Sequence, residues 1–206
     1  MMALSWEKSM KAVRQRRPAF DRERGVEIAE ALFHARGYDA VSVSDLTEAL
    51  GIVPPSLYAA YGSKFELFER TLRNYVANYS LPMEELLSRQ GPPAEVLTNL
   101  FVAAAIHYTA TPPRLGCMVT EAMRADDEKA AAIASALAEP GIALLRTYVA
   151  AHAPAHDVER IVDYLLLTLR GISSYACLGY SQEKLVDCSK IAGGALIAEF
   201  ANSRTS

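Results

Sequence analysis

The sequence has few cysteines and no long apolar run, and each shortage excludes a class of protein. Only three of its 206 residues are cysteine, and neither a Cys-x-x-Cys nor a Cys/His pair with zinc-site spacing occurs. A disulfide framework is therefore excluded, and a reducing, intracellular compartment, the cytoplasm, is expected. The N-terminus lacks the apolar core of a signal peptide, and the longest continuous apolar segment, residues 100–106, is far shorter than the roughly 20 residues that span a bilayer. We expect no membrane partner.

The sequence also lacks the residue clusters that an enzyme or a metal protein needs. Its histidines, His34, His107, His152 and His156, are dispersed, and Pro154 interrupts the helix face that the last two would otherwise share. No nucleophile–base pair, carboxylate dyad or set of metal ligands is evident in the sequence. We therefore expect no catalytic residue, no metal and no cofactor, while a helical enzyme or small-molecule carrier stays open as an alternative.

What the sequence does have is an ordinary globular composition with an uneven distribution of charge. It is 51% hydrophobic and 22% charged, which excludes disorder and low-complexity scaffolds. Seven Lys or Arg against three Asp or Glu give residues 1–24 a net charge of +4, so the rest of the chain carries −7. A basic arm on an acidic body indicates a polyanion bound at one end, with a solvated tail as the alternative. We expect a flexible basic arm (1–20), a helical module (21–80) and a larger domain (81–206).

The helical module begins with an amphipathic pattern over residues 22–36. Its apolar side is formed by Val26, Ile28, Ala29, Leu32 and Phe33. Its polar side is expected to carry mostly Arg24, Glu27, Glu30 and Arg36. Gly37 follows at the position of a left-handed cap residue. Ser42 and Asp45 then approach the capping-box pattern and predict the start of a short helix that ends at Gly51.

A second short helix and a longer one are predicted directly after the first. Pro54-Pro55 marks a helix start and not a break, because proline is tolerated in the first turn. Gly62 ends this helix, and Ser63 with Glu66 predicts a full capping box for the longer helix. Two short helices joined by a glycine-containing turn form the helix-turn-helix pattern, which places its second helix in the major groove of DNA. A plain corner of a helical bundle is the alternative.

The fixed residues of this module resemble one family. Over roughly residues 14–75 the chain looks like the DNA-binding domain of the tetracycline-repressor (TetR/AcrR) family, through Ala31-Leu32-Phe33, Gly37-Tyr38, Ser42-Val43-Ser44-Asp45-Leu46, Gly51-Ile52, Ser56-Leu57-Tyr58, Tyr61-Gly62-Ser63-Lys64 and Leu67-Phe68. The resemblance implies an all-helical homodimer with an N-terminal three-helix DNA reader and a C-terminal effector-binding and dimerisation domain. It also implies a transcriptional regulator of double-stranded DNA, a repressor by family default, released by a small, mostly apolar effector.

Roles for individual residues of the reader follow from their position and from the resemblance. Inward positions, expected to hold the two short helices together, are occupied by Leu46, Leu50, Leu57 and Tyr61. In similar proteins a tyrosine at the position of Tyr58 reaches the DNA backbone, and a lysine at the position of Lys64 meets a phosphate. A cation in the first turn of a helix lies at the positive end of the helix dipole, which is unfavourable. A phosphate bound beside it would offset this cost. Ser42 and Ser44 are candidate phosphate donors, with pure helix capping as the alternative for Ser42.

The segment around Ser56 departs from the family pattern. Val53-Pro54-Pro55 stands where relatives often have Ser-Lys-Gly or Ser-Arg-Ala, and Ala59-Ala60 stands where an aromatic or His pair is common. Few groups remain for bidentate hydrogen bonds to base edges. Readout is therefore expected to depend on Ser56 and on apolar contact of Pro54, Pro55 or Ala59 with thymine methyls. A dimer that has lost DNA binding stays open as an alternative.

Four longer helical segments are predicted in the C-terminal domain. They are a central helix over 96–111, a helix over 125–153 that Pro140 kinks or breaks, and helices over 158–178 and 183–202. The last two resemble the intersubunit four-helix bundle of the family, and the residues assigned to dimerisation are Leu165, Leu169, Ile172, Ala192, Ala195 and Leu196. Two-fold symmetry would then set the two readers about 34–36 Å apart on a near-palindromic site.

An effector cavity is expected between these helices. Its candidate residues are the aromatic, soft or polar-tipped groups on otherwise apolar helices, namely Phe101, His107, Tyr108, Cys117, Met118, Met123, Tyr148, Tyr164 and Tyr175. Each of them alone is better explained by ordinary core packing, whereas as a group they fit a mostly apolar cavity with a few orienting polar groups. The stretch that begins at Leu115-Gly116-Cys117 is similar to a Gly-Cys-Leu segment that opens a helix near the cavity in relatives. A redox or electrophile sensor at Cys117 is an open alternative.

The arginines of the basic arm generate a first prediction. Arg14, Arg16 and Arg17 precede the first helix and are expected to enter an adjacent minor groove, which supplies much of the affinity for DNA. Neutralising all three should flatten the dependence of log K on log salt by about 2–3, because each phosphate contact releases counterions. Binding titrations at several salt concentrations measure this slope, and an unchanged slope would show that the arm is an inert tail.

Overall fold

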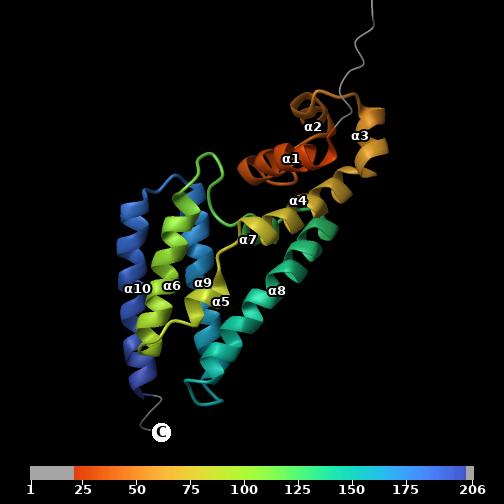
Figure 1. The fold of residues 1–206 in the computed structure, drawn as a ribbon. Helices are drawn as coiled ribbons and strands as arrows, with labels where there is room; N and C mark the ends of the chain where they lie inside the picture. Colours follow the sequence, from red (N-terminus) through yellow and green to blue (C-terminus); the bar gives the residue numbers. More distant parts are fainter. Residues whose placement is uncertain (1–20, 203–206) are drawn as a thin grey trace, which may run out of the picture.

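The computed structural model describes residues 21–202, and over this range the chain is all-helical (Figure 1). Its helices are α1 (Arg22–Arg36), α2 (Val43–Leu50), α3 (Pro54–Tyr61), α4 (Lys64–Asn78), α5 (Met83–Leu87), α6 (Pro93–Thr109), α7 (Met118–Ala122), α8 (Glu128–Ala150), α9 (Val158–Cys177) and α10 (Gln182–Asn202). The predicted all-α class, with an N-terminal helix-turn-helix and a C-terminal helical domain, is confirmed. No described helix is long and apolar enough to cross a membrane.

Side-chain caps set the ends of the N-terminal helices, though not always as predicted. At α2 the capping box is complete, because Ser42 Oγ accepts from the Asp45 amide at 3.1 Å and Asp45 Oδ2 accepts from the Ser42 amide at 2.7 Å. At α4 Ser63 Oγ accepts from the Glu66 amide at 3.1 Å, but the return bond is not formed, so the full box predicted there is wrong. The Glu66 carboxylate lies instead against Gly62, where a Cβ would collide with it and where φ is +87°.

The apolar core of the reader, helices α1–α4, is completed by helices from later in the chain. Phe33, Leu46, Leu57 and Phe68 are almost wholly buried at its centre. The same cluster continues into α7 and the first half of α8, through Met118, Val119, Ala122, Ala130 and Ala134. This core therefore crosses the domain boundary that the sequence predicts after residue 80. The reader and the C-terminal domain pack against each other through one continuous apolar cluster.

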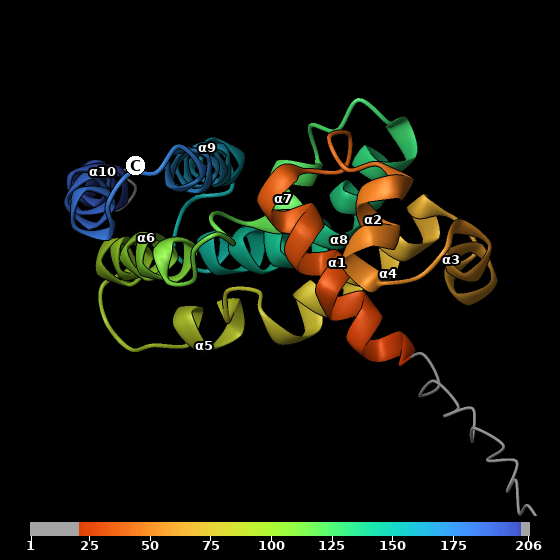
Figure 2. The same cartoon turned by 90° about the horizontal axis from the view of Figure 1, so that it is seen from above.

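A second apolar cluster forms the body of the molecule. It joins α5, α6, α9, α10 and the second half of α8. Helices α6 and α10 approach so closely at Gly193 that a Cβ there would collide with the Thr98 side chain. Seen from above, the body and the reader lie at opposite ends of the molecule, with α8 running between them (Figure 2).

Helix α8 is the one long element that belongs to both clusters. Ala130 and Ala134 are buried in the reader cluster, and Leu145 and Val149 are buried in the body cluster. Pro140 lies between these pairs and inside the helix, so of the predicted kink or break the break does not occur. Its ring is exposed while both halves of α8 are held by packing, which offsets the hydrogen bond that proline removes.

Candidate DNA-binding surface and its junction with the body

Helix α3 is fixed by two inward side chains and presents the rest of its residues to solvent. Leu57 and Tyr61 are 0% and 1% exposed, and the Tyr61 hydroxyl donates to the Arg22 carbonyl at 3.0 Å. The predicted reading residues Pro54, Pro55, Ser56, Tyr58 and Ala59 are all exposed, Tyr58 by 49%. In Figure 1 this helix lies at the outer edge of the molecule, on the side of the reader remote from α6 and α10. The surface needed for groove entry is therefore available.

Two candidate phosphate contacts flank α3, and the structure gives them different surroundings. Lys64, at the start of α4, is partly buried, with its Nζ 4.0 Å from the centre of the Tyr38 ring. Burial lowers the pKa of Lys64, and the nearby carboxylates of Asp39 and Asp127 oppose this shift. Ser44, at the start of α2, is exposed. Both lie in first turns, where backbone amides favour an anion.

The Ser42 hydroxyl is committed to capping. It accepts from the Asp45 amide and donates to the Asp45 carboxylate, which also accepts from Arg36 Nη1 at 2.9 Å. Bonds from Ser42 and then from Arg36 hold the pKa of Asp45 well below its usual range. This network favours the capping role of Ser42 over phosphate binding. Arg14, Arg16 and Arg17 lie outside the described residues, so their roles stay predictions.

The residues predicted to line an effector cavity are divided between the two apolar clusters. The predicted set was Phe101, His107, Tyr108, Cys117, Met118, Met123, Tyr148, Tyr164 and Tyr175. Met118 and Met123 pack in or against the reader core, whereas Phe101 and Tyr164 pack within the body, 6.3 Å apart between ring centres. His107 lines a small cavity at the junction described below. Their division between the two cores gives no support to one shared cavity, and their role in binding an effector stays a prediction.

The residues predicted for dimerisation on α9 and α10 divide by exposure. Leu165, Ile172 and Leu196 are 0%, 6% and 0% exposed and fill the core of a single chain, so their assignment to the dimer surface is corrected. Leu169 and Ala192 are partly buried and Ala195 is exposed. Large apolar residues that do lie exposed here are Leu167, Tyr175, Leu178 and Ile191, and the exposed Ile197 lines the groove described below. A helix that is apolar on two faces gives no sign in its sequence of which face turns inward.

A buried carboxylate joins the reader to the body, and the sequence pattern missed it. Glu30 of α1 was expected on the polar, solvent side, yet it is 1% exposed. Its Oε2 accepts from Asn74 Nδ2 of α4 at 2.5 Å, and its Oε1 lies 3.5 Å from Arg114 Nη1 in the loop between α6 and α7. Burial raises the pKa of Glu30, while Asn74 and Arg114 partly offset this effect. Helix periodicity carried no signal for these partners, which come from distant segments.

Two histidines make further bonds across the same junction. His107 Nε2 of α6 donates to the Tyr79 carbonyl at the end of α4, at 2.8 Å. His34 Nε2 of α1 donates to the Gly116 carbonyl at 3.3 Å, while its Nδ1 is buried with no hydrogen-bond partner among the described residues. Burial lowers the pKa of His34, because removal from water disfavours the charged ring, and hydrogen bonds to the Gly116 and Leu115 backbone partly offset this shift. These groups surround a cavity of about 130 Å³ between the reader and the body.

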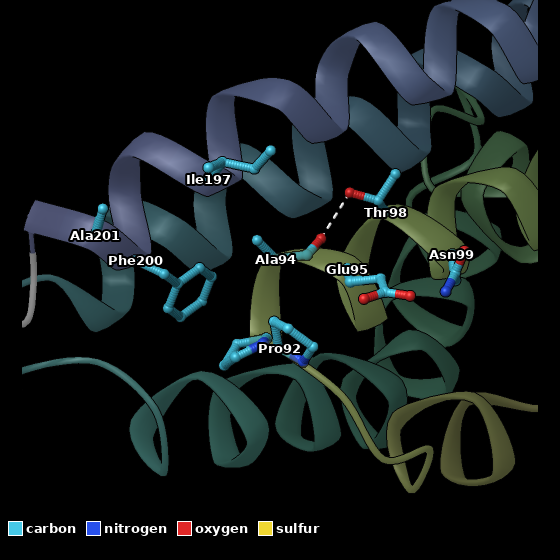
Figure 3. Close-up of a pocket in the computed structure, with 9 residues that line it drawn as sticks. Pro92, Ala94, Glu95, Thr98, Asn99, Ile197, Phe200 and Ala201 are labelled. Atoms are coloured by element: carbon cyan, nitrogen blue, oxygen red, sulfur yellow. Dashed lines mark hydrogen bonds between the residues drawn. The ribbon is translucent and has the colours of Figure 1, made fainter.

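A larger groove lies at the far end of the body, between the start of α6 and the end of α10 (Figure 3). Its volume is about 550 Å³, and its lining is mostly apolar, from Pro92, Pro93, Ala94, Ile197, Phe200 and Ala201. Glu95, Thr98 and Asn99 add polar groups along α6, and Thr98 Oγ1 donates to the Ala94 carbonyl at 2.6 Å. An apolar hollow with a few polar groups is the usual form of a small-molecule site.

The geometry of α2, the turn at Gly51 and the exposed α3 defines a helix-turn-helix DNA-binding protein. A sequence model of the tetR family of bacterial regulatory proteins matches residues 26–71. The chain is 36% identical over 177 residues to the HTH-type transcriptional repressor BdcR of Escherichia coli (strain K12), which covers 86% of this chain and 89% of BdcR. The chain therefore belongs to the TetR family and is a transcriptional regulator.

Further comparisons agree over nearly the whole chain. The HTH-type transcriptional repressor ComR of Escherichia coli (strain K12) is 29% identical over 205 residues, 95% of this chain and 96% of ComR. A cysteine mutant of the TetR family transcriptional regulator CifR, solved with 26-bp double-strand operator DNA, is 31% identical. Its TM-score is 0.75 over 87% of this chain and 99% of that chain. The similarity thus includes the C-terminal domain and not the reader alone.

The junction generates a prediction about stability and pH. The change Arg114→Gln should lower the free energy of unfolding at pH 7.5 by about 1–2 kcal/mol, because it leaves the buried Glu30 carboxylate without its cation. Since the pKa of Glu30 is raised above 4.5, folded Glu30 keeps its proton to a higher pH than the unfolded chain does. The stability that this retained proton contributes is fully present below pH 4.5 and is lost as pH rises through the folded pKa of Glu30. The free-energy cost of Arg114→Gln should therefore be smaller at pH 5 than at pH 7.5.

Urea unfolding at pH 5 and pH 7.5 measures both effects. Arg89→Gln is the matched control, because it removes an exposed i,i+4 pair with Glu85 and should cost less than about 0.5 kcal/mol at either pH. Adding Glu30→Gln to Arg114→Gln should abolish the pH dependence of the loss. A loss that is equal at the two pH values would contradict the assignment.

Proposed function

We propose that this protein is a homodimeric repressor that binds a near-palindromic operator and is released from it by a small, mostly apolar effector. The observation that carries the proposal is the exposed α3, held in place by Leu57 and Tyr61. BdcR and ComR are transcriptional repressors, and CifR was solved in complex with operator DNA. The proposal extends these roles to this chain.

Dimerisation is proposed through the outer face of α9 and α10. Leu167 and Ile191 are 73% and 77% exposed, far more than apolar side chains of this size in the two cores. These two helices lie side by side, on the side of α6 away from α5 (Figure 2). A two-fold axis through this face pairs like surfaces and brings two readers to one side of the dimer. Half-sites are then expected one helical turn of DNA apart.

The effector is proposed to act through α6. This helix carries the apolar groove at its first turns and holds the reader at its last turns, through His107 and the loop that bears Arg114. A ligand that enters between α6 and α10 would move α6 away from Ile197 and Phe200. Such a shift changes the position of the reader only if the ligand binds the DNA-free arrangement more tightly.

Operator binding by the dimer tests the function. A duplex from the DNA upstream of the coding sequence is expected to bind the full chain with a stoichiometry of two subunits. Leu167→Glu and Ile191→Glu should each yield monomers in sedimentation experiments and lower operator affinity at least tenfold, because one reader loses the second half-site. Glu183→Gln, an exposed change at the start of α10, is the control for both readouts. A stable dimer that prefers no DNA sequence would favour the alternative function, a small-molecule-binding dimer.

The groove makes the effector accessible to experiment. Native mass spectrometry of the purified dimer is expected to reveal an apolar compound, and that compound should release the operator when it is added. Ile197→Glu places a charge on the lining of the groove and should abolish both binding and release while operator affinity is kept. Release that persists in Ile197→Glu would place the effector elsewhere.

A further inference from the structure

The outward face of α3 carries almost no hydrogen-bonding group. With Leu57 and Tyr61 buried, the helical spacing of 100° per residue sets Pro55, Ser56 and Ala59 on the opposite side. All three are exposed. Pro55 and Ala59 are four residues apart and form one apolar strip, next to which the Ser56 hydroxyl is the single polar side-chain group. No residue of α3 is charged.

The backbone of α3 does not supply the missing donors. Pro54 and Pro55 occupy the first helical positions and have no N–H group. The amides of Ser56 and Leu57 both donate to the Val53 carbonyl, at 2.9 and 3.2 Å. The first four positions of the helix therefore leave no free amide for a phosphate or a base, in contrast to the usual helix N-terminus.

A surface of this kind fits one chemical feature of the major groove. Of the groups that base pairs present there, the C5-methyl of thymine is apolar, and the others are hydrogen-bond donors or acceptors. Apolar carbon atoms of Pro55 and Ala59 gain from contact with a methyl group and leave a donor or acceptor without a partner. Contact with a base pair that carries no methyl group at the facing position would thus be unrewarded.

We propose that α3 selects its operator by the C5-methyl groups of thymines that face Pro55 and Ala59, and not by hydrogen bonds to base edges. The proposal rests on the proposed function, because it specifies the DNA that the repressor binds. It assigns Pro55 and Ala59 as the residues that determine specificity. Tyr58, beside this strip on α3, and Lys64, at the start of α4, are left to contact the DNA backbone, which positions the helix without reading sequence.

The test uses four pyrimidines at one position. The full-length dimer first selects its operator from a randomised duplex pool, and footprinting then locates the thymines in each half-site. Each of these is replaced in turn by deoxyuridine opposite the same adenine, or by cytosine or 5-methylcytosine opposite guanine. Deoxyuridine removes only the methyl group, whereas 5-methylcytosine keeps the methyl group and changes the hydrogen-bonding pattern.

Methyl readout predicts a particular order of affinities. At one or two positions per half-site, thymine and 5-methylcytosine should bind alike, while deoxyuridine and cytosine should bind about threefold to fivefold more weakly per half-site, as expected for one methyl group removed from an apolar contact. Substitution of both half-sites should multiply the two losses. Readout by hydrogen bonds predicts the opposite grouping, with thymine equal to deoxyuridine, and that result overturns the proposal.

A double-mutant cycle assigns the contact to a residue. Ala59→Gly removes the side-chain methyl, and the penalty for deoxyuridine at the facing position should fall to less than about 1.5-fold. The cost of glycine to the helix falls on both duplexes alike, so it cancels in the ratio. Ala49→Gly, at an exposed position of α2, is the control and should keep the full penalty.

The outcomes separate this inference from the function on which it rests. If the protein selects an operator and its affinity is unchanged when the methyl groups are removed, methyl readout is overturned and the proposed repressor function stands. A pool that yields no preferred duplex overturns the proposed function, and the methyl readout with it. If neither Ala59→Gly nor Pro55→Ala changes the deoxyuridine penalty, Pro55 and Ala59 are not the residues that contact the methyl groups.

Discussion

The burial of Leu57 and Tyr61 in the reader core is the contact on which the DNA-binding surface depends. Helix α3 has only eight residues, and a helix of that length is not stable alone in water. Its position comes from these two side chains and from the bond between the Tyr61 hydroxyl and the Arg22 carbonyl. Because the buried pair fixes the rotation of α3, it also decides that Pro55, Ser56 and Ala59 face outward. The surface follows from the core.

The same core links DNA binding to the rest of the chain. Reader residues pack against α7 and the first half of α8, so the reader has no apolar core of its own that ends at α4. Helix α8 carries this contact across to the body, where Leu145 and Val149 are buried. The buried Glu30 adds a polar link between reader and body, because a buried carboxylate depends on the positions of Asn74 and Arg114. A movement of the body therefore has both an apolar and an electrostatic route to the reader.

An apolar reading helix changes how affinity and specificity are divided. Methyl contacts are individually weak, so a reader of this type needs its affinity from backbone contacts and from a second subunit. The N-terminal arm, whose arginines lie outside the described residues, is the part of the sequence with the charge to supply such contacts. Specificity would then come from several weak contacts with thymine methyl groups, combined with the distance between half-sites that the dimer sets.

The sequence by itself determined the local structure. Periodicity placed the first helix at residues 22–36, and the twin prolines and Gly62 marked both ends of α3, because these signals act within a few residues of each other. The pattern also gave the inward face of α3, at Leu57 and Tyr61, but only the tertiary structure decided which apolar face of α9 and α10 turns inward and where Glu30 lies. Glu30 was expected in solvent and is buried, while Leu165 and Leu196 were expected at a subunit interface and fill the core of one chain. The physical reason is that burial depends on partners such as Asn74 and Arg114, which are distant in sequence and leave no mark on the local pattern.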